Sequence, residues 1–574
     1  MRKSGIAAAL VTVLLTALAC TNTPPPPVVT SPVAQSSTAA VPTASQIVIG
    51  VDDITGGYNP HNLADQSTIT TALSQLLLPS VFRPNDEGTY ELDPTLMRSA
   101  EVTSTDPFTV TYQIRQDASW SDGAPIAVED FVYLADAMRD QPGVVQPAGY
   151  RLISSIQPSE GGKGVQVQFS EPYPGWQTLF SNLLPQHLLK DAPGGWQGAL
   201  QDSFPAYGGP FSIKTRDNAR GEIILERNER YWDKPAAVDQ LVLRRSDATG
   251  LAGALRSGND QFVLSRTDSA GLNQLQALGP SVQLQTVASP RVAEVLLRPA
   301  NGALVDDQVR EAVSALVDRN KLIDEGAGGG PSAGLRAEAQ VLPPSADGYA
   351  PTIPAGYGVP DPAKAESLLT GAGYVKEAGI WRKDGKALTL VVASPGQQEP
   401  YASMAKELSN QLVAAGIQVN TLNPQPRDLF ANLLALPVSQ GTQASAGNAG
   451  AVGVDIAVVP LPAGGDAATV LASRFGCRPG QSTPSSNVAV IPANPTAVCD
   501  ENLQTTIDEA LTGTKPMADA LAELEPELWA QHTAIPLFQL ADTLATGQGI
   551  SGMTAGPPLL GPFGNAVNWT RSGR

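Results

Sequence analysis

A strand, a turn and a helix follow one another between residues 109 and 133, and this unit limits the possible folds more than any other stretch of the sequence. Apolar and polar residues alternate over 109–114, as they do in a half-buried strand. Asp122 and Gly123 then form a pair typical of a turn, and a helical pattern follows it. The stretch therefore predicts a strand, a turn and a helix in direct succession.

Further strand-like runs alternate with helical stretches along the chain. The clearest helical pattern covers 401–415, where apolar residues repeat at helical spacing and Gly416 follows as a stop. Alternation of this kind predicts an α/β architecture. The strand-like runs lie at 47–51, 165–169, 223–225, 241–244, 294–297, 388–393, 417–422 and 454–461.

The residues of the first unit, Trp120 to Gly123 followed by Glu129 to Phe131, resemble a signature of solute-binding proteins that feed ABC importers. The resemblance is to the oligopeptide- and nickel-binding class, family 5 of the extracytoplasmic solute-binding proteins. Taken alone, each matching segment is ordinary structure, so the matches identify a fold and do not locate a ligand. Five more segments resemble the family in the family's own order: 208–211, 225–232, 254–260, 309–319 and 363–374.

The resemblance implies a bilobal fold of the periplasmic-binding-protein type, with two lobes joined by a hinge and a cleft between them. It implies a first lobe made of 46–89, 205–298 and 535–574, with an extra domain inserted at 90–204. The second lobe would then span 299–534. In such a protein the ligand sits between the lobes and stabilises a closed form by touching both faces.

The N-terminus has the pattern of an export signal over residues 1–19. Arg2 and Lys3 precede an apolar run from 6 to 19, which is shorter than the roughly twenty residues that a membrane span needs. The run ends in Ala19 and Cys20, which resembles a bacterial lipoprotein processing site, although Leu18 stands one place closer to the cysteine than usual. Cys20 is therefore expected to carry lipid, with simple cleavage as the alternative.

Residues 20–45 are expected to form a disordered tether, because their Pro, Ser and Thr content cannot bury enough apolar surface to fold. The formal net charge of the chain is −18, so nucleic acid is not expected as a partner. In an exported chain the two remaining cysteines, Cys477 and Cys499, predict a disulfide. The alternative is two unpaired thiols, and no metal site is expected because no further Cys or His stands at ligand spacing.

The sequence does not indicate an enzyme. It contains 3 histidines and no HExxH or Gly-x-Ser-x-Gly pattern, so zinc and serine hydrolases lack their basic parts. The glycine run 326–330 is followed by Pro331 and Ser332, where a phosphate-binding loop needs Gly-Lys-Ser/Thr. We therefore expect no catalytic residues and no cofactor.

Three residues are candidates for ligand contact. Tyr58 and Asn59 follow the first strand, where members of the resembled family line the cleft, but they could equally form a turn. Peptide-binding members would carry a carboxylate in an aromatic-rich stretch of the second lobe, where this chain has only Asp466. Asp466 could instead cap a helix. The altered stretch and the aromatic fraction of 5 % weaken a peptide-binding interpretation.

The proline-rich tether, the altered stretch and residues 561–569 together resemble the LpqW-type lipoproteins of mycobacteria and their relatives. That group shares the binder fold and is associated with control of phosphatidylinositol mannoside and lipoarabinomannan synthesis. The resemblance therefore adds a second hypothesis, a regulatory lipoprotein that binds a phosphatidylinositol mannoside or a protein partner and has little or no role in transport.

The first hypothesis is a monomeric solute-binding protein, held by lipid on the outer face of the cytoplasmic membrane. It would bind a peptide-like or glycolipid ligand and serve an ABC permease. The two hypotheses differ in the cleft that they require. A sealed polar pocket of roughly a few hundred Å³ would favour capture of a small ligand, and a shallow or apolar groove would favour a lipid or protein partner.

Overall fold

The computed structural model describes residues 45–300, 302–435, 453–477 and 494–571. The expected signal, Cys20 and all of the expected tether except Ser45 lie outside these residues. Within the described part of the chain, no helix combines the length and the apolar character that crossing a membrane requires.

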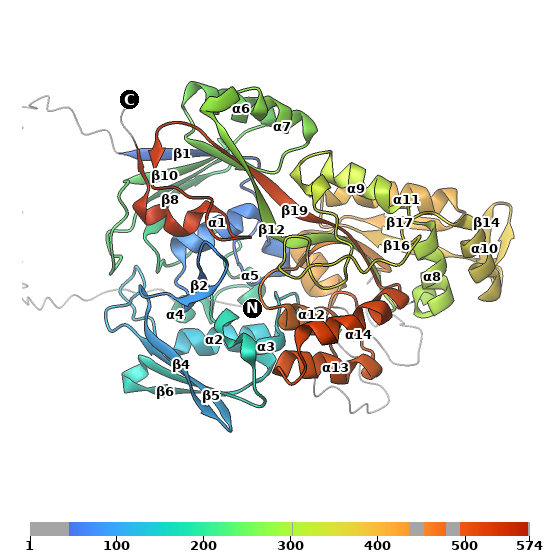
Figure 1. The fold of residues 1–574 in the computed structure, drawn as a ribbon, viewed down its shortest axis with the longest axis horizontal. Coiled ribbons are helices and arrows are strands. Elements are labelled where there is room, and N and C mark those ends of the chain that lie inside the picture. Colours follow the sequence, from blue (N-terminus) through green and yellow to red (C-terminus); the bar gives the residue numbers. More distant parts are fainter. Residues whose placement is uncertain (1–44, 301, 436–452, 478–493, 572–574) are drawn as a thin grey trace, which may run out of the picture. The chain divides into compact units, whose positions relative to one another are not determined.

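A ten-stranded sheet runs through the folded part of the protein. Two long strands, β12 and β19, occupy its middle and separate a β8 half from a β17 half (Figure 1). In sheet order the strands are β17 (Gln418–Leu422), β16 (Thr389–Ala393), β18 (Ile456–Pro462), β12 (Gln283–Leu297), β19 (Ala534–Thr546), β11 (Phe262–Ser265), β1 (Gln46–Val51), β10 (Gln240–Arg245), β9 (Glu222–Arg227) and β8 (Phe211–Asp217).

Strands β12 and β19 connect the two halves of the sheet. They pair antiparallel from Gln283 opposite Thr546 to Leu296 opposite Ala534. One end of β19 also pairs with β11, and the opposite end of β12 pairs with β18. Nearly every residue of β19 is buried, which suits a strand that is covered on both faces. The two strands are therefore the continuous backbone link between the halves.

Helices cover both halves of the sheet. Helices α1 (Thr68–Leu77), α6 (Ala248–Ser257) and α7 (Ser269–Gln276) belong to the β8 half. Helices α8 (Asp307–Leu316), α9 (Arg319–Ala327), α10 (Pro362–Gly371) and α11 (Tyr401–Ala414) belong to the β17 half, where their apolar faces form a core of their own with β16 and β18. The predicted helix at 401–415 is thus present as α11.

Residues 97–169 contribute a separate four-stranded sheet in the order β4 (Met97–Thr105), β5 (Phe108–Ile114), β7 (Gly164–Phe169) and β6 (Ile153–Ser159). Helices α2 (Val128–Asp140) and α3 (Ala148–Arg151) pack beside it. The predicted strand, turn and helix are β5, the Asp122-Gly123 turn and α2. Gly123 has φ of +96°, a conformation that favours glycine.

Three helices that follow β18 in the chain, α12 (Ala467–Phe475), α13 (Glu501–Thr512) and α14 (Met517–Ala530), share an apolar core with this smaller sheet (Figure 1). Leu471 and Phe475 of α12 belong to the same buried cluster as Tyr150 and Leu179. A hydrogen bond of 2.6 Å joins the hydroxyls of Tyr173 and Thr469 at this contact. Segments far apart in sequence are therefore packed directly on one another here.

The residues that carry the family resemblance around the turn before α2 have a structural role. Trp120 is fully buried, and its Nε1 donates to Asp130 Oδ2 over 3.2 Å. The same carboxylate accepts from the backbone N–H of Ala127 and of Gln186, at 3.1 and 3.0 Å. Burial raises the pKa of Asp130 to about 6. This carboxylate therefore connects the start of α2 to Trp120 and to the backbone of Gln186.

We predict that Asp130→Ala lowers the free energy of unfolding by about 3 kcal/mol, because it leaves one buried and two partly buried donors without their acceptor. The exposed Asp136 on the same helix provides the matched control, and Asp136→Ala should cost less than about 0.5 kcal/mol. Urea unfolding followed by circular dichroism measures both changes. Equal effects of the two substitutions would contradict the structural role of Asp130.

Candidate functional site

A cavity of about 590 Å³ lies where the two halves of the large sheet and the smaller sheet's region meet. Helix α1 and the segment around β2 (Phe82–Pro84) line one side, and the start of α12 lines another. Pro290 of the long strand β12 is also part of the wall. The lining therefore comes from segments 60–90, 138–182, 290, 341–347, 462–470 and 558–560.

The wall of this cavity combines apolar residues with polar ones, and its polar groups are mostly hydroxyls and amides. Among the described lining residues the one arginine or lysine is Arg83, whose Nε donates to Asp93 Oδ2 over 2.6 Å and whose Nη2 donates to the carbonyl of Leu78. Glu87 and Asp347 are the acidic residues of the wall. The neutral polar residues are Gln66, Thr70, Thr71, Ser74, Gln75, Ser80, Gln146, Thr178, Ser181, Asn182, Ser345 and Thr469.

Helix α1 supplies the densest group of these polar side chains. Ser67 caps the helix by accepting from the N–H of Thr70 over 3.0 Å. Thr70, Thr71, Ser74 and Gln75 then lie on one face at helical spacing, while the leucines of the helix are buried in the core. The amphipathic sequence of α1 therefore turns a row of hydroxyl and amide groups toward the cavity.

His61 lies in the wall beside this helix. Its Nε2 is 2.9 Å from the carbonyl oxygen of Asn182, so Nε2 carries the proton and the ring is a donor there. Burial lowers the pKa of His61 to about 4, and the hydrogen bond to Asn182 offsets part of that effect. The imidazole is therefore neutral at physiological pH.

Tyr58 and Asn59, the predicted ligand contacts, are buried and do not line the cavity. The Tyr58 hydroxyl donates to the carbonyl of Ile54 over 3.1 Å, and its ring stacks on Phe204 with centroids 5.9 Å apart. Asn59 is fully buried and its Oδ1 accepts from the N–H of His61 over 3.0 Å. The two residues shape the loop that presents Pro60 and His61 to the cavity.

Asp466 is the N-cap of α12 in the structure. Its Oδ2 accepts from the backbone N–H and the hydroxyl of Thr469, at 2.8 and 2.6 Å. Its neighbours Gly465 and Ala467 line the cavity, whereas Asp466 does not. Burial raises the pKa of the Tyr90 hydroxyl, and the negative charge of Asp466 raises it further. The carboxylate therefore orients the helix that forms this part of the wall.

The sequence analysis missed a buried ion pair between Asp65 and Arg427. Arg427 precedes the short helix η7 (Asp428–Leu433), and its Nε donates to Asp65 Oδ1 over 3.1 Å across 362 residues of sequence. Its Nη2 donates to the other carboxylate oxygen and to the carbonyl of Ala199. Burial raises the pKa of Asp65, and the charge of Arg427 opposes that shift. The pair ties the β17 half to the loop before α1.

Further hydrogen bonds join the same regions around the cavity. Gln146 Nε2 donates to the carbonyl of Gly464 over 2.7 Å, and the N–H of Ala148 donates to Ser473 Oγ over 3.2 Å. At the sheet, Thr68 Oγ1 donates to Asp542 Oδ2 of β19 over 2.7 Å. Direct contacts therefore hold the walls of the cavity to one another.

A disulfide joins Cys477 to Cys499 just beyond α12. Within the described residues there is no group of three or more His, Cys, Asp or Glu side chains that could hold a metal ion.

Comparison with known proteins identifies the family. Residues 91–453 match the family model described as "Bacterial extracellular solute-binding proteins, family 5 Middle". The chain belongs to this family. The resemblance stated from the sequence is confirmed, and family 5 accounts for the motif in β5 and α2.

Two relatives show which kinds of family 5 protein this chain resembles. It is 36% identical over 602 residues to the "Probable monoacyl phosphatidylinositol tetramannoside-binding protein LpqW" of Mycobacterium tuberculosis, with 92% of each chain covered. It is 24% identical over 369 residues to the "Oligopeptide-binding protein OppA" of Mycobacterium bovis, with 63% of this chain and 61% of the relative covered. The resemblance to LpqW-type proteins is thus confirmed as well.

Solved structures confirm the bilobal binding-protein fold of this family 5 chain. The oligopeptide-binding protein AppA from Bacillus subtilis, solved with a nonapeptide, has a TM-score of 0.70 at 16% identity and covers 92% of this chain and 100% of its own. The periplasmic EDTA-binding protein EppA has a TM-score of 0.69 at 23% identity and covers 92% of this chain and 97% of its own. The expected fold class is therefore correct.

We predict that Arg427→Met destabilises the protein by about 3 to 5 kcal/mol, because it leaves the Asp65 carboxylate buried without its cation. The double variant Asp65→Asn with Arg427→Met should recover a large part of that loss. Arg382→Met, at a more exposed arginine, is the control and should change little. Chemical unfolding of the four proteins gives the comparison, and a double variant no better than Arg427→Met would contradict the pairing.

We predict that His61 makes the protein less stable as the pH falls from about 6.5 to about 4. The unfolded imidazole takes up a proton below its ordinary pKa of 6.5, whereas the folded one stays neutral down to about 4. The difference corresponds to about 3 kcal/mol. His61→Gln, which keeps an N–H donor, should flatten the melting temperature between pH 4 and 6.5.

His187→Gln is the control for this measurement, because the His187 side chain is 31% exposed. It should leave the slope of the pH profile in place. An unchanged slope in His61→Gln would contradict the assignment.

Proposed function

We propose that this protein is an exported, membrane-tethered solute-binding protein that captures an uncharged, hydroxyl-rich ligand in the cavity of about 590 Å³. The observation that carries the proposal is the polar part of the wall, where hydroxyl and amide groups outnumber charged ones and Arg83 is already bound to Asp93. Neutral donors and acceptors match sugar-like hydroxyls, while a free peptide would need partners for its two charged ends. The volume is that of a small-ligand pocket.

In this proposal the lobes have the limits expected from the sequence: 46–89, 205–298 and 535–574 for the first, with 90–204 inserted, and 299–534 for the second. Strands β12 and β19 are the hinge, since they connect the halves of the sheet. A ligand that touches both lobes stabilises the closed form. Tyr58, Asn59 and Asp466 act on the ligand indirectly, through the loop and the helix that they hold in place.

Residues 1–19 are the proposed export signal, and Cys20 is the proposed lipid attachment site. The protein then acts as a monomer on the outer face of the cytoplasmic membrane and delivers its ligand to an ABC permease, as a binding protein and not as an enzyme. The relatives named as binding proteins support this role.

A second candidate function is favoured by the relationship to LpqW, whose name describes binding of a monoacyl phosphatidylinositol tetramannoside. In this version the cavity takes the mannoside part of such a glycolipid, and the protein regulates lipomannan and lipoarabinomannan synthesis without transport. The hydroxyl and amide groups of the wall suit both versions, because each places hydroxyl groups of a sugar in the cavity.

We predict that phosphatidylinositol mannosides or soluble manno-oligosaccharides raise the melting temperature of the mature protein and that short peptides do not, because a ligand of the native state stabilises it by mass action. Ala467→Trp, which fills the cavity at the first turn of α12, should abolish the rise. Ala363→Trp is the control at an exposed position in the first turn of α10. A rise with peptides alone would overturn the proposed ligand class and restore peptide capture.

A further inference from the structure

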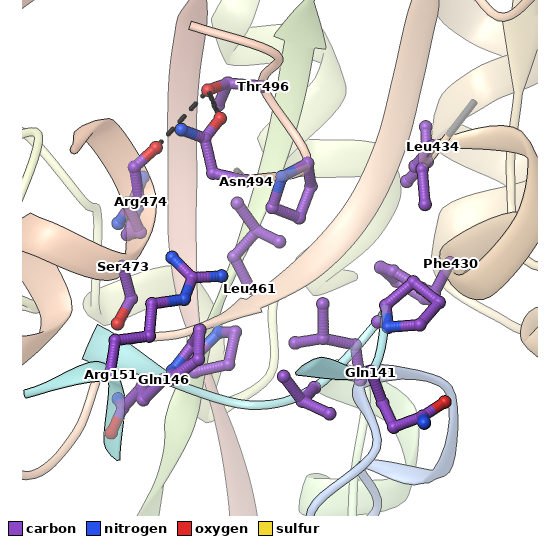
Figure 2. A pocket seen from close by; sticks show the side chains of 18 residues that line it. Gln141, Gln146, Arg151, Phe430, Leu434, Leu461, Ser473, Arg474, Asn494 and Thr496 are labelled. Atoms are coloured by element: carbon purple, nitrogen blue, oxygen red, sulfur yellow. Dashed lines mark hydrogen bonds between the residues drawn. The ribbon is translucent and has the colours of Figure 1, made fainter. Parts of the chain in front are cut away.

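Tyr90, Gln146 and Gly465 meet in one corner of the large cavity, although they come from distant parts of the sequence. Tyr90 begins β3 (Tyr90–Leu92), Gln146 lies between α2 and α3, and Gly465 stands between β18 and α12. Gln146 also lines a smaller cavity of about 60 Å³, whose lining residues are drawn in Figure 2. The corner therefore joins β3 and the loop after α2 to the start of α12.

Gly465 leaves this corner open. It has φ of +87°, a conformation that favours glycine, so no side chain fills the space beside its Cα. A Cβ placed there would lie 3.6 Å from Gln146 Oε1 and 3.9 Å from Tyr90 Oη. Among the described residues outside the adjoining chain, no other atom comes within 4 Å of that point. Gly465 is exposed, so the space opens onto the cavity.

The two oxygens that flank this space have no partner among the described residues. The half-buried Tyr90 makes no hydrogen bond through its hydroxyl there. Gln146 Nε2 donates to the carbonyl of Gly464 over 2.7 Å, which fixes the amide while its Oε1 accepts no bond from a described residue. Gln146 Oε1 can therefore accept a hydrogen bond, and the Tyr90 hydroxyl can both donate and accept one.

Two further features of this corner bear on the ligand. Gln146 has φ of +49°, which few residues other than glycine adopt, and strained residues of this kind concentrate at ligand-binding sites. Burial raises the pKa of the Tyr90 hydroxyl, and the negative charge of Asp466 raises it further, so the hydroxyl keeps its proton at physiological pH. The same negative charge disfavours a carboxylate or a phosphate of the ligand at this place.

We propose that Tyr90 and Gln146 form a subsite for one hydroxyl group of a sugar, which lies in the open space beside Gly465. The sugar hydroxyl donates to Gln146 Oε1 and accepts from the Tyr90 hydroxyl, so both capacities of an alcohol group are used. The inference rests on the proposed capture of a hydroxyl-rich ligand and names the residues that select it. With the proposed lobe limits, the bound hydroxyl lies between the inserted domain and the second lobe.

The first test separates the hydroxyl of Tyr90 from its ring in the full mature protein. Isothermal titration calorimetry with mannotetraose should show that Tyr90→Phe weakens binding about three- to tenfold, the effect of one lost hydrogen bond. The melting temperature without sugar should stay as in the wild type, because the hydroxyl has no protein partner to lose. Tyr133→Phe is the matched control and should bind as the wild type does, since the Tyr133 hydroxyl also lacks a partner among the described residues and does not line the cavity.

The second test fills the open space. Gly465→Ala places a methyl group beside both oxygens and should weaken mannotetraose binding by about tenfold or more. Gly379→Ala is the control for the backbone strain of such a change, because Gly379 has φ of +84° and open space where its Cβ would lie. It should bind mannotetraose as the wild type does.

The outcomes separate the subsite from the proposed function. Wild-type affinity in both Tyr90→Phe and Gly465→Ala would overturn the subsite and leave the proposed ligand class in place. A lower melting temperature of sugar-free Tyr90→Phe would show that the hydroxyl serves the fold, and it would overturn the subsite as well. If the wild type itself does not bind mannotetraose, the proposed ligand class fails and the subsite fails with it.

Discussion

The antiparallel pairing of β12 with β19 is the contact on which the rest of the structure depends. Each strand is long enough to lie beside both halves of the sheet, so the halves share one hydrogen-bonded ladder. Helix α1 is held to that ladder by Thr68 and Asp542, and Pro290 of β12 lines the large cavity. The cavity therefore lies beside these two central strands, where segments from both halves of the sheet meet.

The polar residues around the cavity have two different tasks. Asp130, Asp466 and Asp65 each accept several hydrogen bonds from the protein, so their carboxylates fix loops and helix ends. The polar groups of the wall are mostly neutral hydroxyls and amides, as on α1, with Glu87 and Asp347 as its acidic residues. These three carboxylates thus serve the architecture, and most of the polar groups that face the cavity are neutral. Such a division explains why a family signature such as Trp120 and Asp130 carries no information about the ligand.

Much of the fold could be predicted from the sequence, because local patterns determine it. The runs at 47–51 and 388–393 and the helix at 401–415 are found as β1, β16 and α11. The run at 294–297 predicts only the end of β12. Pro290 interrupts the strand pattern in the sequence, and in the structure it lies in a bulge between Ala288 and Val292. The sequence of β19 shows no alternation of apolar and polar residues, because the strand is buried on both faces. It also contains Pro536, which is unusual inside a strand.

The site was less accessible to prediction. Thr70 and Gln75 read as an ordinary polar helix face, and only the packing of distant segments turns that face into a cavity wall. Asp65 and Arg427 are single charges 362 residues apart, and no local pattern links them. Tyr58, Asn59 and Asp466 were predicted from their positions in the family pattern, and in the structure they stand next to residues that line the cavity. The side chains that line the cavity are their neighbours.

The contacts between Tyr173 and Thr469 and between Gln146 and Gly464 have a mechanical consequence. They join segment 138–182 to segment 462–470, and both segments line the cavity. Any motion that widens the cavity between these two segments must break the two hydrogen bonds. A motion in which the two segments move together keeps them and therefore costs less free energy.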